Sequence, residues 1–330
     1  MNARVQIAIA LAAGVLMAQP AFAQWPLFKE QGIPRKADGT LNPDGPPPRA
    51  ADGHVDLSGL WDRAGGFGIG PPQGQRPQGQ GQGPGQGQAQ RPQGPGPAAG
   101  GPAAGGPAAG GPAAGGPPRG PRTPPRPVLP ADGSPPLANF GNVGAGFPDG
   151  LPYQPLAAQL RAERIGNNMK NNPDAHCLPM GLTQLHLHPQ PRKLVQTPGL
   201  IVIMYEGNQG LRQIFTDGRK VPELNDDLQP WWYGYSAGHW EGDTLVVETV
   251  GFRDDVWLDV NGSPLTSKGR MTERFRRPSF GLLQIDVTID DPAAYTKPFT
   301  FRINQRLTAD DELIEFVCNE NERSSEHFDR

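Results

Sequence analysis

The sequence predicts a mainly β protein, an antiparallel meander that forms a closed or partly open lipocalin-like barrel with one short helix before it. Short β-branched or aromatic runs follow one another every roughly eight to fourteen residues from Leu194 onward, with tight turns between them, as in all-β meanders. Only one segment has a good helical pattern. About nine strands with alternating faces suit a barrel, and a two-sheet sandwich is the alternative.

The single helix is predicted over residues 156–169. Leu156, Leu160 and Ile165 recur near helical spacing. The charged residues of the same segment are expected to be solvated: Arg161, Glu163 and Arg164. The Asn-Asn-Pro-Asp segment at 171–174 ends the helix.

The strands that follow are separated by Gly, Pro, Asn and Asp. Glu241-Gly242-Asp243 reads as a short hairpin turn. An earlier run, residues 55–61, would have little use without a core and is predicted to pair with the C-terminal sheet. The predicted strands after the helix are 193–196, 200–206, 211–216, 232–240, 244–252, 271–276, 282–290, 299–307 and 313–318.

The N-terminus predicts a signal peptide over residues 1–23. Arg4 forms a short basic region, residues 5–18 are apolar, and Ala21-Phe22-Ala23 is a small-x-small cleavage site. The apolar run is too short for a comfortable transmembrane helix, and no membrane span is predicted. The mature chain is expected to begin at Gln24 and to be periplasmic or secreted.

Residues 65–130 contain almost nothing that could form a core. Gln/Gly/Pro repeats are followed there by PAAGG units and an Arg/Pro run. This composition cannot bury enough apolar surface to offset the entropy of ordering, so it predicts disorder. We interpret the segment as an insertion between an N-terminal segment that docks on the barrel, 24–64, and a β domain, 131–330. A cell-wall tether and a spacer are the alternatives.

The two cysteines are Cys177 and Cys318. In an oxidising compartment an even pair is more often a disulfide than two free thiols. So long a closed loop contributes roughly 4–5 kcal/mol in the chain-entropy model. Cys177 as a nucleophile beside His176 is the weaker alternative, because adjacent side chains on a strand or turn point apart.

Charge and motifs exclude several classes of partner. The formal net charge is −3 at pH 7, with acidic and basic residues mixed along the chain. This balance argues against nucleic acid and anionic membrane surfaces as main partners. No nucleotide-binding motif and no complete metal motif occurs, so no cofactor is predicted and a small molecule is the expected partner.

Residues 231–277 carry four of the six Trp and two of the five Tyr. This aromatic density exceeds what core packing requires and predicts a ligand pocket at a barrel mouth. We expect Tyr235 and His239 to point inward, with Arg274 or Glu273 opposite, because Tyr and His offer hydrogen bonds to a ligand. The predicted ligand-binding residues are Trp232, Tyr235, His239, Trp257 and Arg274.

Several motifs resemble a family of uncharacterised secreted proteins of soil bacteria and alphaproteobacteria. The resemblance covers nearly all of the mature chain except the repeats and implies one continuous domain. It brings no activity and no catalytic residues. The motifs are DLSGLW within residues 52–61, TDGR within 214–219, GHWEGDTLVVET within 238–252, TERFRR at 272–277 and VTIDDP within 287–299.

His186-Leu187-His188 is a weak metal-site candidate. If the segment is extended, both imidazoles lie on one face, and His176 or His239 would complete a three-His site. Spacing alone supplies no third ligand, so hydrogen-bonded histidines are the favoured interpretation and no metal is predicted.

Two groups of residues are candidates for catalysis. Ser236, His239 and Asp255 make a weak triad, because Ser236 lacks the strained elbow that exposes a nucleophile. The acidic set Asp254, Asp255, Asp259 and Glu273 is stronger. If extended, Asp255, Trp257 and Asp259 share a face, and paired carboxylates beside an aromatic platform suit glycoside chemistry. The same set would also bind sugars without chemistry, or form ion pairs with Arg253, Arg270 and Arg274.

The leading hypothesis is a periplasmic β-barrel protein that binds a small apolar, aromatic or glycan ligand. The alternative class is a hydrolase, lyase or isomerase that uses Asp255, Asp259, Glu273 or His239 in the same pocket. A third class, an envelope structural protein, rests only on the Pro/Gly-rich segment.

Overall fold

The computed structural model of this chain describes residues 29–64, 127–225 and 227–320. The predicted signal peptide and the repeats up to residue 126 lie outside the described residues. Contacts within the chain group the described residues as one compact unit. The fold below is that of the described part of this unit.

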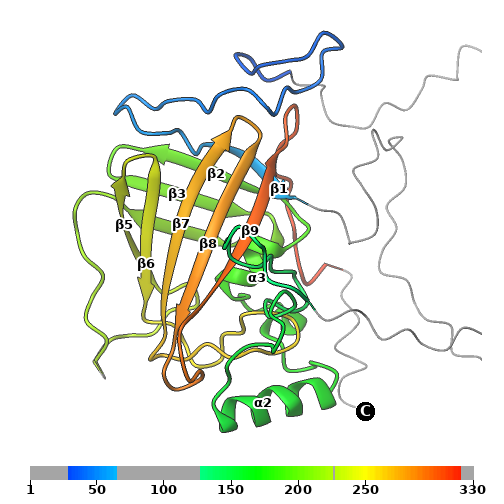
Figure 1. The fold of residues 1–330 in the computed structure, drawn as a ribbon, viewed down its shortest axis with the longest axis vertical. Helices are drawn as coiled ribbons and strands as arrows, with labels where there is room; N and C mark the ends of the chain where they lie inside the picture. Colours follow the sequence, from blue (N-terminus) through cyan, green and yellow to red (C-terminus); the bar gives the residue numbers. More distant parts are fainter. Residues whose placement is uncertain (1–28, 65–126, 226, 321–330) are drawn as a thin grey trace, which may run out of the picture. The chain divides into compact units, whose positions relative to one another are not determined.

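Nine strands form a closed barrel in the order of the sequence, from β1 to β9 (Figure 1). β1 (Gly59–Arg63) closes it, because it pairs antiparallel with both β2 (Arg192–Thr197) and β9 (Phe299–Leu307). The mainly β, lipocalin-like prediction is confirmed, and the two-sheet sandwich is wrong. The remaining strands are β3 (Leu200–Tyr205), β4 (Leu211–Phe215), β5 (Tyr235–Glu241), β6 (Thr244–Val250), β7 (Arg270–Ser279) and β8 (Leu282–Asp290).

Two features of the strands differ from the prediction. β4 and β5 are parallel, which requires a long connection, and residues 216–234 supply it. The strand predicted at 313–318 does not form, and residues 311–317 have no regular structure. The reason is the closure of the barrel: the free edge of β9 is already taken by β1, so no edge remains for another strand.

The predicted helix is α2 (Pro155–Gly166), which begins with Pro at its first position. It ends before Asn168 and Met169, which both have left-handed backbones with φ of 54° and 55°. Leu156 is 79% exposed, and Ala157 is the buried residue of this helix. Among the described residues no helix has the length and apolar character needed to cross a membrane.

A second helix, α3 (Leu182–Leu187), was not predicted, and all six of its residues are buried. It lies beside β9 and above α2 in Figure 1, and the His186 carbonyl accepts a hydrogen bond from Gln305 of β9 at 3.2 Å. Two short 3-10 turns also form: η1 (Pro173–His176) precedes α3, and η2 (Gly207–Gln209) follows β3.

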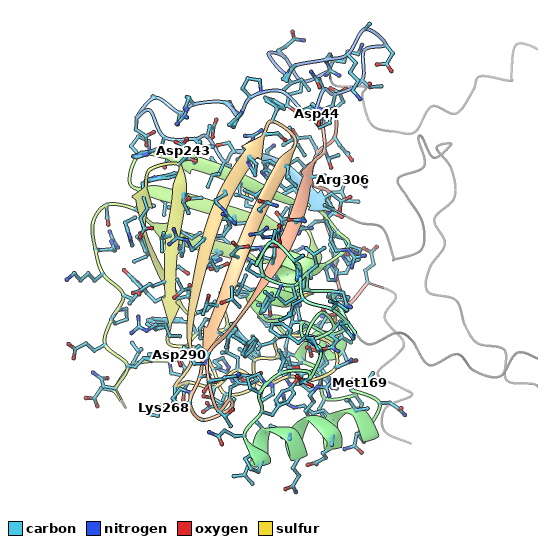
Figure 2. All side chains as sticks on the ribbon, in the orientation of Figure 1. Asp44, Met169, Asp243, Lys268, Asp290 and Arg306 are labelled. Carbon is cyan, nitrogen blue, oxygen red and sulfur yellow. A yellow bond between two sulfur atoms is a disulfide. The ribbon has the colours of Figure 1, made fainter. Side chains whose placement is uncertain are left out.

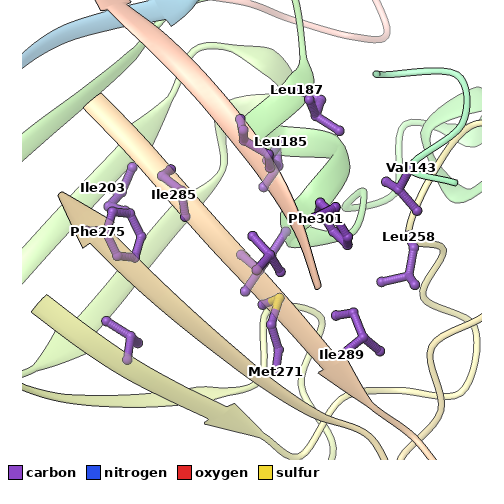
Figure 3. Packing of buried hydrophobic residues seen from close by; sticks show 14 of the residues in the cluster. Val143, Leu185, Leu187, Ile203, Leu258, Met271, Phe275, Ile285, Ile289 and Phe301 are labelled. Atoms are coloured by element: carbon purple, nitrogen blue, oxygen red, sulfur yellow. The ribbon is translucent and has the colours of Figure 1, made fainter. Parts of the chain in front are cut away.

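The core is made by inward-facing side chains that alternate along the strands. In β8, Leu283, Ile285, Val287 and Ile289 are all fully buried, whereas the residues between them are partly exposed. Complete burial of each such side chain contributes roughly 1.5–3 kcal/mol. Figure 3 shows these strand residues gathered with side chains of α3, for example Phe275, Ile285 and Phe301 with Leu185 and Leu187.

The segment before β1 crosses the upper end of the barrel (Figure 1). Arg49 forms an ion pair with Asp243 in the β5–β6 turn, which Figure 2 labels at this end. The His54 ring stacks on Trp240 with centroids 4.6 Å apart, and Val55 and Leu57 are buried. These contacts hold the segment to the β5–β6 hairpin.

Candidate functional site

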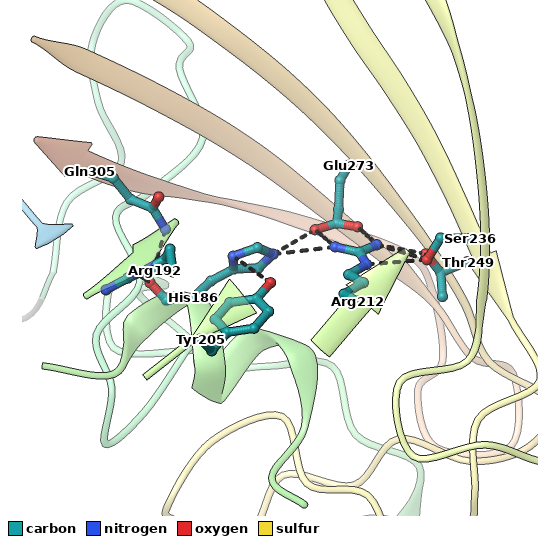
Figure 4. A network of polar contacts seen from close by, with 8 residues as sticks. All are labelled: His186, Arg192, Tyr205, Arg212, Ser236, Thr249, Glu273 and Gln305. Carbon is teal, nitrogen blue, oxygen red and sulfur yellow. Dashed lines mark hydrogen bonds and ion pairs between the residues drawn. The ribbon is translucent and has the colours of Figure 1, made fainter. Parts of the chain in front are cut away.

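A network of charged and polar side chains lies inside the barrel (Figure 4). We call it the Arg212–Glu273 network; its members are His186, Tyr205, Arg212, Ser236, Thr249 and Glu273. Glu273 of β7 accepts hydrogen bonds from Arg212 of β4, at 3.0 Å from Nη1, and from Nε2 of His186 in α3, at 2.9 Å. Arg212 also donates to the hydroxyls of Ser236 and Thr249, at 3.1 and 2.9 Å.

The electrostatics of this network fix its protonation states. Burial alone would raise the pKa of Glu273, but the Arg212 charge and the hydrogen bonds from His186 and Arg212 lower it to about 2. Burial lowers the pKa of His186 and raises that of Tyr205. Glu273 is therefore ionised, His186 neutral and Tyr205 protonated near neutral pH. With all members buried and bonded to one another, the network joins α3 to the barrel wall.

The two histidines proposed as weak metal ligands do not lie on one extended face. His186 belongs to α3 and points into the network, and His188 is the residue that ends the helix. The prediction of an extended segment is wrong because Leu182, Leu185 and Leu187 bury as a helical turn. Within the part of the chain that the structure describes, no group of three His, Cys, Asp or Glu residues is placed to hold a metal.

The predicted direction of the β5 side chains is wrong. Ser236 points inward to Arg212, so Tyr235 and His239 point outward. The His239 side chain is 64% exposed and contacts Glu241. Tyr235 stacks on Phe215 at 5.4 Å on the outer face. The buried Arg212 charge decides the parity, because the inward positions must supply its hydrogen-bond partners.

The β7 residues predicted opposite them are divided between the two faces. Glu273 points inward as described above. Arg274 points outward and its Nη2 donates to Glu241 at 2.8 Å. Glu273 and Arg274 therefore do not share a site: Glu273 is inside the barrel, whereas Arg274 lies on the outer face with His239, and both Arg274 and His239 contact Glu241.

The other catalytic groupings are not assembled either. Ser236 is buried in the network, while His239 is on the outside, so the triad is wrong. Residues 254–260 form turns rather than an extended strand, so Asp255 and Asp259 do not share a face. Asp259 is fully buried and accepts hydrogen bonds from Val143 N at 3.0 Å and from the Ser263 hydroxyl at 2.7 Å. Asp254 instead accepts from Ser267 N at 2.7 Å.

A cavity of about 320 Å³ lies between α2, η1 and the loops on either side of β5 and β6, and we call it the α2 cavity. Three predicted site residues line it: Trp232, Trp257 and Asp255. The remaining lining comes from α2 and the residues after it, and includes none of the residues predicted for ligand binding or catalysis. These residues are Leu160, Glu163, Arg164, Asn167, Asn171, Pro173, His176 and Leu178.

Guanidinium groups hold the aromatic walls of the α2 cavity. The Arg164 guanidinium lies 4.4 Å from the ring centre of Trp257, which is 2% exposed. Arg253 lies 4.5 Å from the Trp232 ring and pairs with Asp255 at 2.9 Å. The hydrogen bonds from Arg253 lower the pKa of Asp255, which is therefore ionised at the cavity wall. Cation–π stacking of this kind fixes indole orientation.

The predicted disulfide is confirmed and borders the α2 cavity. Cys177 and Cys318 are bonded, with their Cα atoms 5.6 Å apart. Cys177 stands between the lining residues His176 and Leu178 in a left-handed conformation with φ of 57°. The Leu178 carbonyl also accepts a hydrogen bond from Asn208 Nδ2 at 2.6 Å. This cavity wall is therefore held covalently to the segment beyond β9.

A second depression, of about 630 Å³, lies among the loops at 129–136, 147–152 and 297–300. Six prolines contribute to its lining, and none of the residues predicted for a ligand site does. The α2 cavity is therefore the candidate site.

No family model, curated protein or solved structure matches this chain.

Proposed function

We propose that this chain is a secreted or periplasmic β-barrel protein that binds a small ligand with an apolar or aromatic body in the α2 cavity. The observation that carries the proposal is the convergence of Trp232, Trp257 and Asp255 on one cavity. Its volume of about 320 Å³ is near the lower end of the roughly 300–1,000 Å³ of small-molecule sites. Leu160, Pro173 and Leu178 add an apolar wall to the two indoles.

Two further observations support this proposal. Of the residues named as catalytic candidates, Asp255 alone lines the α2 cavity, and its ion pair with Arg253 makes it a poor general acid. The disulfide and the resemblance to a secreted family favour an oxidising compartment outside the cytoplasm. Binding is thus better supported than a hydrolase, lyase or isomerase activity.

A glycan is the second candidate ligand. The planar amide and carboxylate side chains of Glu163, Asn167 and Asn171 line the cavity together with the indoles. Planar polar groups beside an aromatic surface are able to bind both the hydroxyls and the apolar face of a sugar ring.

Calorimetry with indole, methyl benzoate and diacetylchitobiose tests the proposal and separates the two ligand classes. We expect indole and methyl benzoate to bind, and Trp232→Ala to weaken them at least roughly tenfold through loss of an aromatic wall. The matched control is Trp231→Ala, since Trp231 is 42% exposed, packs on Tyr235 and does not line the cavity. Equal loss in both variants, or no binding of any of the three compounds, would contradict the proposal.

Asp255→Asn tests the enzymatic alternative. The protein is incubated with aromatic esters and glycosides, and the products are followed by mass spectrometry. We expect no turnover. Turnover that is present in the wild type and lost in Asp255→Asn would replace binding by catalysis as the function of the α2 cavity.

A further inference from the structure

Arg164 lies at the α2 cavity with hydrogen-bond donors to spare. Its guanidinium stacks on Trp257, and Nη1 donates to the Gly262 carbonyl at 2.9 Å. A Cβ at Gly262 would lie 2.8 Å from Cδ of Arg164, so glycine at this position lets the side chain lie flat against the loop. The stacking fixes the direction of the guanidinium, and Arg164 is one of the residues that line the cavity.

Three more deeply buried arginines have fuller sets of acceptors. Arg212 is paired with Glu273. Arg192 donates to the carbonyls of His186, His188 and Gln190. Arg277 donates to the carbonyls of Phe280, Asp56 and Ser58.

Arg164 has no comparable set of acceptors. Among the described residues it bonds to one carbonyl, and no carboxylate oxygen lies within 4.0 Å of its guanidinium nitrogens. Burial lowers its pKa to about 10, which still leaves it charged at neutral pH. A half-buried positive charge with no carboxylate at ion-pair distance is costly, and an anion in the cavity would relieve that cost.

The charges around Arg164 are compatible with an anionic ligand. Asp255 is neutralised by Arg253 at 2.9 Å. Glu163, which directly precedes Arg164 in α2, is exposed and lines the same cavity. Glu163 is therefore the acidic group that should oppose an anion there.

We propose that the α2 cavity takes a small aromatic carboxylic acid, whose carboxylate pairs with Arg164 and whose ring lies against Trp232 and Leu160. The inference rests on the proposed function and adds the charge and the polarity of the ligand. Guanidinium and carboxylate match in planar geometry, and charge-assisted pairs of this kind are stronger than neutral hydrogen bonds.

The test compares indole-3-acetate with its methyl ester by calorimetry on the full-length mature protein. We expect the acid to bind roughly 10- to 100-fold more tightly than the ester at low salt. Arg164→Met keeps an apolar stem against Trp257 and should remove this preference while the ester still binds. Arg161→Met is the matched control, because Arg161 is on the same helix, lies over Tyr153 and does not line the cavity.

Glu163→Gln gives a second readout at an exposed position. Removing the opposing charge should tighten the acid several-fold and leave the ester unchanged. A weaker acid in Glu163→Gln would overturn the proposal, and so would glucuronate binding more tightly than indole-3-acetate.

The two levels of the proposal fail differently. If the acid and the ester bind equally tightly and Trp232→Ala weakens both, the carboxylate inference is wrong and the proposed function stands. If neither compound shows binding that depends on Trp232, the proposed function itself is wrong.

Discussion

Replacing Glu273 with Gln leaves the Arg212 guanidinium charged and buried inside the barrel. Both side chains are essentially inaccessible, with exposed fractions of 1% and 0% for Arg212 and Glu273. The variant also removes the carboxylate that His186 contacts. Arg274, the next residue on the same strand, forms an exposed ion pair with Glu241, and this pair serves as the comparison.

Two independent arguments give the size of the effect. Removal of one partner from a buried ion pair costs about 3–5 kcal/mol, because the other charge stays unpaired. The fall of the Glu273 pKa from 4.5 to about 2 corresponds to about 3 kcal/mol of preference for the ionised form in the folded state. Glu241→Gln, at an exposed pair, should cost less than about 1 kcal/mol.

Urea unfolding followed by Trp fluorescence measures both variants. We expect Glu273→Gln to lower the free energy of unfolding by about 3–5 kcal/mol, and addition of Arg212→Met to recover much of the loss. A cost for Glu273→Gln as small as that for Glu241→Gln would refute the argument that the network joins α3 to the wall.

Three further predictions follow from the same structure. Because the pKa of Glu273 is depressed in the folded state, its contribution to stability is complete above pH 4.5 and disappears as the pH falls toward about 2. The difference in unfolding free energy between wild type and Glu273→Gln should therefore shrink over that window. A difference that does not change with pH would count against this prediction. Cys177→Ser with Cys318→Ser should lower the free energy of unfolding by roughly 4–5 kcal/mol, since the bridge closes a 141-residue separation, and unchanged urea stability would argue against this role. Cleavage at a protease site inserted between residues 65 and 126 should leave both fragments together in gel filtration, because β1 pairs with β2 and β9; free fragments would contradict the insertion interpretation.

The barrel was predictable because its strands carry the information locally. In β8, apolar and polar residues alternate from Leu283 to Asp290, and the flanking turns contain Gly and Pro. α3 was missed because a buried run of six residues is too short to show a periodicity that distinguishes a helix from a strand. The parallel β4–β5 pair was missed because the direction of a strand depends on its connection and leaves no pattern in the strand itself.

The site was predictable only in part. Trp232, Trp257 and Asp255 stand out as aromatic and acidic residues in one run, but the cavity is completed by α2, which is far away in the sequence. The direction of the β5 side chains depended on Arg212, which has the same parity as the buried Ile214 in β4. That shared parity was a usable signal that Arg212 points inward and that its partners on β5 must do the same.

The central claim is that a small ligand binds at the α2 cavity, and the indole N–H signals of a ¹⁵N-labelled sample test it most directly. Assignment by single Trp→Phe variants would identify each signal. On addition of indole-3-acetate we expect the Trp232 and Trp257 signals to shift, because both rings line the cavity. The Trp61 signal should stay in place, since its N–H donates to the Leu57 carbonyl at 3.0 Å inside the core. Shifts confined to other Trp residues, or no shift at saturating ligand, would contradict the account.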